Sequence, residues 1–225
     1  MKEYDIKIVC FDELIELYSE EWIYLFDKCF KSGIDKARNI FFNKYQNNKG
    51  NVALCFNNGK MCASYSVIFD NLGRPICLSV DTMSDGSIRL ATVKIANVLY
   101  DHLKHSGFSF ILGFPNKKIT NLRKRFLGWV AVESYYLCIR WKGLTKNEAT
   151  DFQINRPDNF LFNSNIITRG VIKIMRISGF EITLTNKKNG FFNFAQKNLY
   201  CKILLDGKNI DTNNLKLNSY SIDVP

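Results

Sequence analysis

The stretch from Met83 to Thr92 contains residue types that could hold a negatively charged group. It is polar, it carries Ser87 and Arg89, and it separates an apolar run from an amphipathic segment that begins at Ala91. The first backbone N–H groups of a helix have no partner within the helix, and the positive end of the helix dipole points the same way. A strand that leads into a helix in this manner predicts an anion site, and we expect a phosphorylated cofactor there.

The elements that would position this loop form a β-loop-α-β-α unit from Ser79 to Trp129, whose two apolar runs are expected to be buried neighbouring strands. Asn57-Asn58-Gly59-Lys60 is a strong hairpin signal earlier in the chain. Hydrophobic periodicity, caps and turns predict strands at Ile6–Phe11, Val52–Phe56, Met61–Phe69, Pro75–Met83, Phe108–Phe114 and Trp129–Trp141, and helices at Asp12–Gly33, Asp35–Tyr45, Ala91–His105 and Thr120–Leu127. This order predicts an α/β fold with a mixed, mostly antiparallel sheet flanked by helices.

The last third of the chain differs in character from the rest. Asn147 to Asn159 is polar and resembles a linker. Beyond it, short alternating segments separated by turns predict a small antiparallel sheet, with strands at Gly170–Ile177, Phe180–Thr185, Phe191–Ala195 and Leu199–Leu205. We therefore expect one domain over residues 1–145 and a β-rich extension over 146–225, which would cover an acceptor site or form a dimer contact.

Composition narrows the class of protein. The 225 residues are 46% hydrophobic and carry a net charge of +10, which favours a folded core and phosphate-bearing partners. The lysines are spread along the chain and no nucleic-acid-binding motif is visible, so nucleic acid is the weaker reading. Seven scattered cysteines without ligand spacing predict reduced thiols and no metal site. No apolar run is long enough to span a membrane and no signal peptide is seen, so we expect a cytoplasmic protein.

These features resemble the GNAT (Gcn5-related) N-acyltransferase superfamily, and most of all its bacterial members that acylate nucleotide-linked amino sugars for surface polysaccharides. The resemblance covers residues 5–141 and depends on Asp81-Thr82-Met83, Gly113-Phe114-Pro115-Asn116 and Gly128-Trp129. It implies acyl-CoA as co-substrate, acetyl or another short chain, and an amino sugar as acceptor. The pantetheine arm would pair with the strand before the loop, and the loop would cradle the pyrophosphate.

The resemblance also assigns roles to residues. Asp81 would be the general base or position the amine, although a turn or cap carboxylate explains it equally well. Asn116 could bind pantetheine or substrate, or be an ordinary loop residue, and Glu133 is a second candidate base or a solvent-facing residue. The residues expected to bind the cofactor are Thr82, Met83, Ser87, Ile88, Arg89, Leu90, Ala91, Thr92, Asn116, Asn121 and Lys124. The basic run Arg123 to Arg125 would contact the ribose phosphate or form a solvated helix face.

The sequence departs from the pattern of the superfamily at two positions. Leu90 stands where the loop pattern R/Q-x-x-G-x-G/A has a glycine, and Lys124 stands where many members place a tyrosine that protonates the thiolate. Two other functions therefore stay open: a non-catalytic binding protein with this fold, and an acyltransferase for another small amine. No cysteine is paired with a base, which favours direct attack of the amine on the thioester over a covalent enzyme intermediate.

Overall fold

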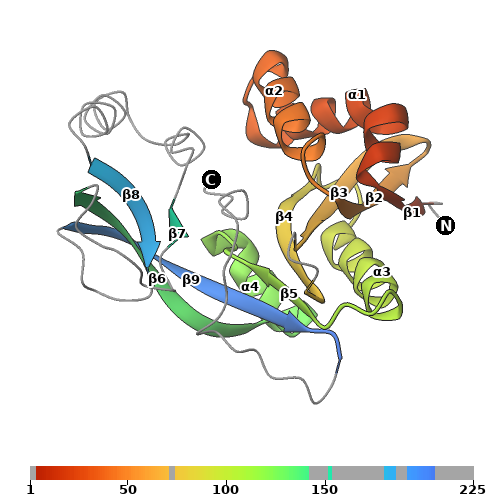
Figure 1. The fold of residues 1–225 in the computed structure, drawn as a ribbon. Helices are drawn as coiled ribbons and strands as arrows, with labels where there is room; N and C mark the ends of the chain where they lie inside the picture. The colour runs from red at the N-terminus through yellow and green to blue at the C-terminus, as the bar shows by residue number, and fades with distance from the viewer. Residues whose placement is uncertain (1–3, 71–73, 142–151, 154–179, 186–191, 206–225) are drawn as a thin grey trace. The chain divides into compact units, whose positions relative to one another are not determined.

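The structure is a computed structural model that describes residues 4–70, 74–141, 152–153, 180–185 and 192–205 (Figure 1). The chain forms two compact units. The first comprises the described residues within Met1–Leu112, Asn121–Trp129 and Lys202–Lys208, and the second those within Gly113–Thr120 and Val130–Cys201. In the described part of the chain, no helix is long and apolar enough to cross a membrane.

The sheet of the first unit consists of five strands in the order β1-β2-β3-β4-β5. Their bounds are Tyr4–Cys10, Gly50–Asn57, Lys60–Phe69, Ile76–Ser84 and Phe110–Gly113. Strands β1 to β4 are antiparallel, and β5 runs parallel to β4. The expected hairpin turn is confirmed: Asn58 and Gly59 have φ of 51° and 77°, and two positive φ values in a row fit the twist of a two-residue hairpin.

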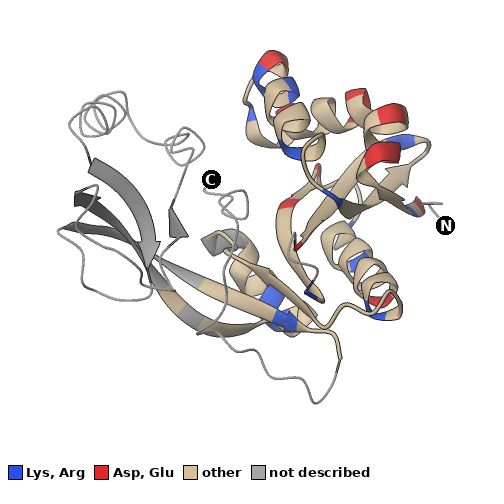
Figure 2. Ribbon diagram, in the orientation of Figure 1, with Lys and Arg blue, Asp and Glu red and all other residues tan. Residues whose placement is uncertain are grey.

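Helices α1 (Phe11–Phe30) and α2 (Ile34–Tyr45) follow β1 directly. They bury an aromatic cluster in which the Trp22 ring lies 5.1 Å from Phe41 and 5.3 Å from Tyr45. The first helix begins at Phe11, one residue before the predicted start at Asp12, and Cys10 takes the N-cap position without a side-chain hydrogen bond. Charged residues lie along the turns of both helices, whereas β2 and β3 together carry a single one (Figure 2).

Helix α3 (Ala91–His105) has the predicted bounds, and its buried residues include Ile95, Leu99 and Leu103. The short helix that follows β5 begins earlier than expected, as α4 at Lys117–Leu127. Close packing fixes one glycine of the first unit. A Cβ on Gly50 would lie 2.0 Å from the Val67 carbonyl oxygen and 2.5 Å from the Phe11 ring, so only glycine fits there.

The sheet of the second unit is built around β6 (Val130–Trp141). It pairs antiparallel with β9 (Phe192–Ile203) on one side and with β8 (Phe180–Thr185) on the other, and β7 (Phe152–Gln153) pairs with β8. The prediction of two strands at Phe191–Ala195 and Leu199–Leu205 is wrong, since a single strand spans both. Gly170–Ile177 and most of the expected linker lie outside the described residues.

Candidate functional site

A β-bulge lies in the middle of β4. Tyr65 on β3 pairs with Thr82, but Val67 pairs with Ser79, so that Val80 and Asp81 together face the single residue between the two partners. A bulge bends its strand and re-aims the side chains next to it, and bulges are frequent beside active sites. Here Ser79 and Thr82, three positions apart, both accept hydrogen bonds from the Arg123 side chain of α4. Asp81, which lies between them, contacts Lys44 of α2 instead.

One edge of β4 is unpaired over most of its length. The strand pairs with β5 only at Ile76, Cys77 and Leu78, and then continues alone on that side to Ser84. The backbone N–H and C=O groups of Ser79–Ser84 on this edge meet no strand in the described part of the chain. Such an edge can pair with an extended ligand, which gains backbone hydrogen bonds as an added strand would.

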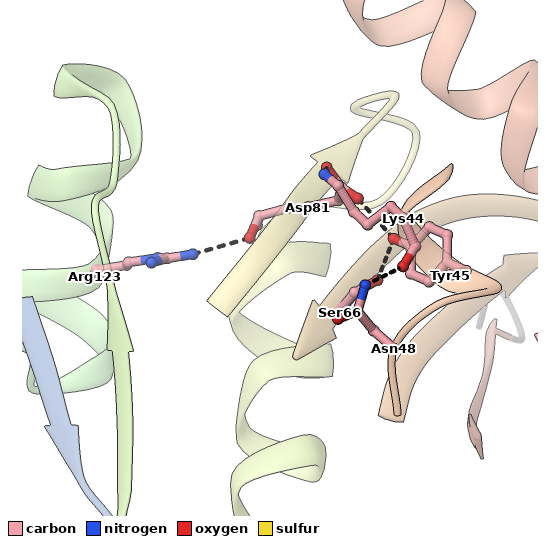
Figure 3. Close-up of polar contacts among 7 residues, drawn as sticks. Lys44, Tyr45, Asn48, Ser66, Asp81 and Arg123 are labelled. Atoms are coloured by element: carbon pink, nitrogen blue, oxygen red, sulfur yellow. Dashed lines mark hydrogen bonds and ion pairs between the residues drawn. The ribbon is translucent and has the colours of Figure 1, made fainter. Parts of the chain in front are cut away.

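Asp81 is buried in a polar cluster contributed mainly by α2 (Figure 3). Its Oδ1 lies 2.8 Å from Lys44 Nζ, and its Oδ2 accepts a hydrogen bond of 2.7 Å from the Tyr45 hydroxyl. The same hydroxyl lies 2.9 Å from Ser66 Oγ, and Asn48 Nδ2 donates to the Lys44 carbonyl at 2.6 Å. Asp81 is therefore a carboxylate with an opposite charge and a hydroxyl donor already bound to its two oxygens.

Arg123 of α4 lies at the other end of this arrangement, with a relative exposure of 4% (Figure 3). Its Nη2 donates to Ser79 Oγ at 2.7 Å and to Thr82 Oγ1 at 3.0 Å. The guanidinium lies 4.4 Å from the Trp129 ring and 5.4 Å from the Tyr65 ring, in the range of cation–π contacts. The expectation of a solvated helix face is wrong for this residue.

A hydrogen-bonded aromatic group contacts Arg123. Trp129 Nε1 donates to the Tyr100 hydroxyl at 2.8 Å, and that hydroxyl lies 3.3 Å from the Tyr65 hydroxyl. Burial, together with the neighbouring Tyr65, raises the pKa of Tyr100 well above its usual value. The Tyr100 phenol therefore stays neutral, and the group fixes the two rings that contact the guanidinium.

The loop after β4 is fixed at its start. Asp85 Oδ2 lies 2.8 Å from Lys28 Nζ of α1, and Asp85 Oδ1 accepts a hydrogen bond from the Ser87 amide at 2.9 Å. Burial raises the pKa of Asp85, but the hydrogen bonds from Lys28 and Ser87 outweigh it, so the pKa lies below its ordinary value. Gly86 has φ of 82° with open space around it, as a tight turn requires.

Leu90, the departure from the loop pattern, keeps the backbone conformation of a glycine. Its φ is 56° and its ψ is 27°, in the left-handed region that costs a residue with a Cβ about 1–2 kcal/mol. It forms the N-cap of α3 without a side-chain bond, its side chain is 42% exposed, and its carbonyl accepts from the amides of Val93 and Lys94. The first turn of α3 has no acidic residue, so no side chain of that turn neutralises the positive end of the helix dipole.

The other expected cofactor residues are distributed along both sides of this loop. Thr82 accepts from Arg123, and Met83 and Ala91 are buried. Four further expected residues lie within four positions of the start of α3: Ser87 and Arg89 are exposed, and Ile88 and Thr92 are half-buried.

The expected residues beyond β5 lie at the start of α4, along α4 and on β6. Asn116 caps α4: its Oδ1 accepts from the Ile119 amide at 3.0 Å and its carbonyl accepts from the Thr120 amide at 2.9 Å. Asn121 and Lys124 are exposed on α4. Glu133 lies on β6, where the structure describes its backbone and not its side chain.

Sequence reasoning missed Lys44 and Tyr45 and assigned Arg123 to the wrong environment. For Lys44 and Arg123, helical spacing in the sequence contained a signal. Arg123 lies four residues before Leu127, on the buried stripe of α4, and Lys44 continues the spacing of the buried Ala37 and Phe41 on α2. A charged residue within an apolar stripe is rare enough to mark a polar site.

Comparison with known proteins supports the fold. No protein-family model matches the sequence, and no curated protein matches it. A protein assigned as an acetyltransferase from Pyrococcus horikoshii superposes with a TM-score of 0.56 at 9% identity, over 98% of this chain and 96% of that chain. One assigned to the GNAT family from Desulfovibrio desulfuricans does so with a TM-score of 0.51 at 6% identity, over 90% and 100%. The chain has the fold of the GNAT acetyltransferases, as its sequence pattern predicted.

Proposed function

We propose that this protein is an acyl-CoA-dependent N-acyltransferase. The observation that carries the proposal is the unpaired edge of β4, which leads from the bulge to the N-terminus of α3 in a GNAT fold. A CoA ester fits this path: its pyrophosphate would accept hydrogen bonds at the start of α3, and its amide-bearing arm would pair with the backbone of Ser79–Ser84.

The reaction would be a direct transfer. The amine nitrogen attacks the thioester carbon, the C–N bond forms, the C–S bond breaks, and the amine proton passes to solvent or to the leaving sulfur. Holding both reactants in place converts a bimolecular step into one within a complex. For Asp81 we favour positioning the amine over acting as its base, because a proton on this carboxylate would disrupt its contacts with Lys44 and Tyr45. The exposed position of Lys124 gives no support to a role at the sulfur.

For the acceptor we propose a nucleotide-linked amino sugar, as in the synthesis of surface polysaccharides. The net charge of +10 supports it, because a basic protein attracts a diphosphate and repels polyamines or basic peptides. Another small amine is the alternative acceptor, and the two are separated by assaying thiol release with amino-sugar nucleotides against the matching free amino sugars.

The test of the cofactor site is thermal unfolding with CoA and acetyl-CoA. A ligand at a hundredfold excess over its Kd stabilises the folded state by about 2.7 kcal/mol, which corresponds to roughly 5–10 °C for a chain of this size. We expect such a shift. The absence of a shift with any CoA ester would refute the enzyme proposal and favour a non-catalytic binding protein with this fold.

A charge variant locates the site. Thr92→Glu adds a negative charge to the first turn of α3, which favours the helix but repels the pyrophosphate. We expect the free protein to keep its stability and the shift with CoA to disappear. Thr92→Gln, of the same size without the charge, is the matched control and should retain most of the shift. Equal binding by the two variants would place the phosphates elsewhere.

A further inference from the structure

We propose that Arg123 recognises a carboxylate on the transferred acyl group, so that the preferred donor is a CoA ester of a short dicarboxylic acid. This inference rests on the proposed function, because it presumes that a CoA ester follows the edge of β4. It begins from the environment of one buried cation.

The hydrogen-bonding capacity of Arg123 is only partly used. A guanidinium has five N–H donors, and the two bonds of Nη2, to Ser79 Oγ and to Thr82 Oγ1, leave three donors without an acceptor among the described residues. The residue as a whole is only 4% exposed. Buried charges in proteins are almost always paired, because an unpaired one is costly.

No described carboxylate neutralises this charge. Asp81 is the acidic residue on the adjacent part of β4, and its two oxygens bind Lys44 and Tyr45 instead. The rings of Trp129 and Tyr65 hold the cation by cation–π contact but carry no net charge. The charges of Lys44 and Asp81 thus neutralise each other, and the positive charge of Arg123 is not neutralised by Asp81.

The two hydroxyl groups bound to the cation are also able to donate. Because Ser79 Oγ and Thr82 Oγ1 accept from Arg123, the hydrogens of their own hydroxyl groups are available for another acceptor. Two hydroxyls and a guanidinium that contact one another are suited to an anion with several acceptor oxygens, such as a carboxylate.

The position of Ser79, Thr82 and Arg123 along β4 indicates which part of the ligand they would contact, namely its acyl end. An arm that begins with its phosphates at the α3 N-terminus and follows β4 from Ser84 toward Ser79 places its thioester at the far end of that edge. Ser79 and Thr82 flank the bulge at that end, and Arg123 binds both. A charge recognised there belongs to the acyl group, since the phosphates lie at the opposite end.

The test compares CoA esters of matched length. Affinities for succinyl-CoA and butyryl-CoA, which differ by a terminal carboxylate in place of a methyl group, are measured by calorimetry on the full chain, with malonyl-CoA, glutaryl-CoA and acetyl-CoA alongside. We expect at least one dicarboxylic ester to bind about tenfold or more tightly than its uncharged counterpart, as a hydrogen-bonded charge typically provides. Arg123→Met should abolish this preference, whereas Arg123→Lys should retain part of it.

Each outcome decides. Equal affinity of the wild-type chain for charged and uncharged esters overturns the inference while leaving the acyltransferase proposal in place, and so does a preference that survives in Arg123→Met. If no CoA ester binds, both proposals fail. The wild-type comparison alone decides the matter should the variant not fold.

Discussion

The pair formed by Lys44 and Asp81 allows a quantitative test of the polar cluster. The side chains of Lys44 and Asp81 are 11% and 7% exposed, so water has little access to solvate either charge when its partner is removed. Removing one partner of a buried ion pair leaves an uncompensated charge and costs about 3–5 kcal/mol. Against a total stability of about 5–15 kcal/mol, Lys44→Met should therefore be among the most destabilising changes of a single lysine in the described structure.

The assay is urea denaturation of Lys44→Met, Asp81→Asn and the double variant. We expect Lys44→Met to lower the free energy of unfolding by about 3 kcal/mol or more. The double variant should lose clearly less than the sum of the two single losses, because the second change removes the charge that the first leaves unpaired. Lys104→Met, a change of an exposed lysine on α3, is the control and should change stability by less than about 0.5 kcal/mol. Equal effects of Lys44→Met and Lys104→Met, or strict additivity in the double variant, would refute the reasoning.

The remaining predictions concern the loop and the packing of the sheet. Leu90→Gly should leave stability unchanged or raise it by up to about 1 kcal/mol, because glycine removes left-handed strain at an entropic cost, and unfolding in urea measures this. The lowered pKa of Asp85 stabilises the fold above the ordinary aspartate pKa, and this contribution is lost as pH falls through the lowered value. Melting temperatures between pH 6 and pH 2 should hence fall less steeply for Asp85→Asn, by a small margin because Lys28 is exposed. Gly50→Ala should cost about 1–3 kcal/mol or more in urea unfolding because its Cβ meets the Val67 carbonyl, and a neutral result would contradict the packing described here.

Much of the first unit could be predicted because local signals coincide with the tertiary structure. The Asn-Gly turn sets two positive φ values, and the apolar spacing of Ala91–His105 sets both the helix and its buried face. Errors at the ends of elements arise where no side chain caps the helix, as at Cys10. The joined strand at Phe192–Ile203 was missed because its polar middle reads as a turn while its pairing with β6 keeps it extended.

The site was predicted only in part, for a physical reason. The loop and Asp81 follow from the order of strand and helix, which is local in sequence. The bulge follows from a register between two strands that no periodicity reveals, and Ser79 and Thr82 on its two sides contact the same guanidinium. The partners Lys44 and Arg123 come from helices that are far from β4 in sequence.

The first compact unit is completed by a segment near the end of the described chain. The Leu204 amide donates to the Ser109 carbonyl at 2.9 Å, and the Leu204 side chain is only 7% exposed. Lys202 Nζ lies 6.0 Å from the centre of the Tyr100 ring, which belongs to the aromatic group that contacts Arg123. During synthesis the ribosome must therefore translate past residue 204 before this unit can bury all of its partners. A nascent chain that stalls earlier leaves an apolar surface open to chaperones and proteases, so the finished fold depends on the order in which the polypeptide emerges.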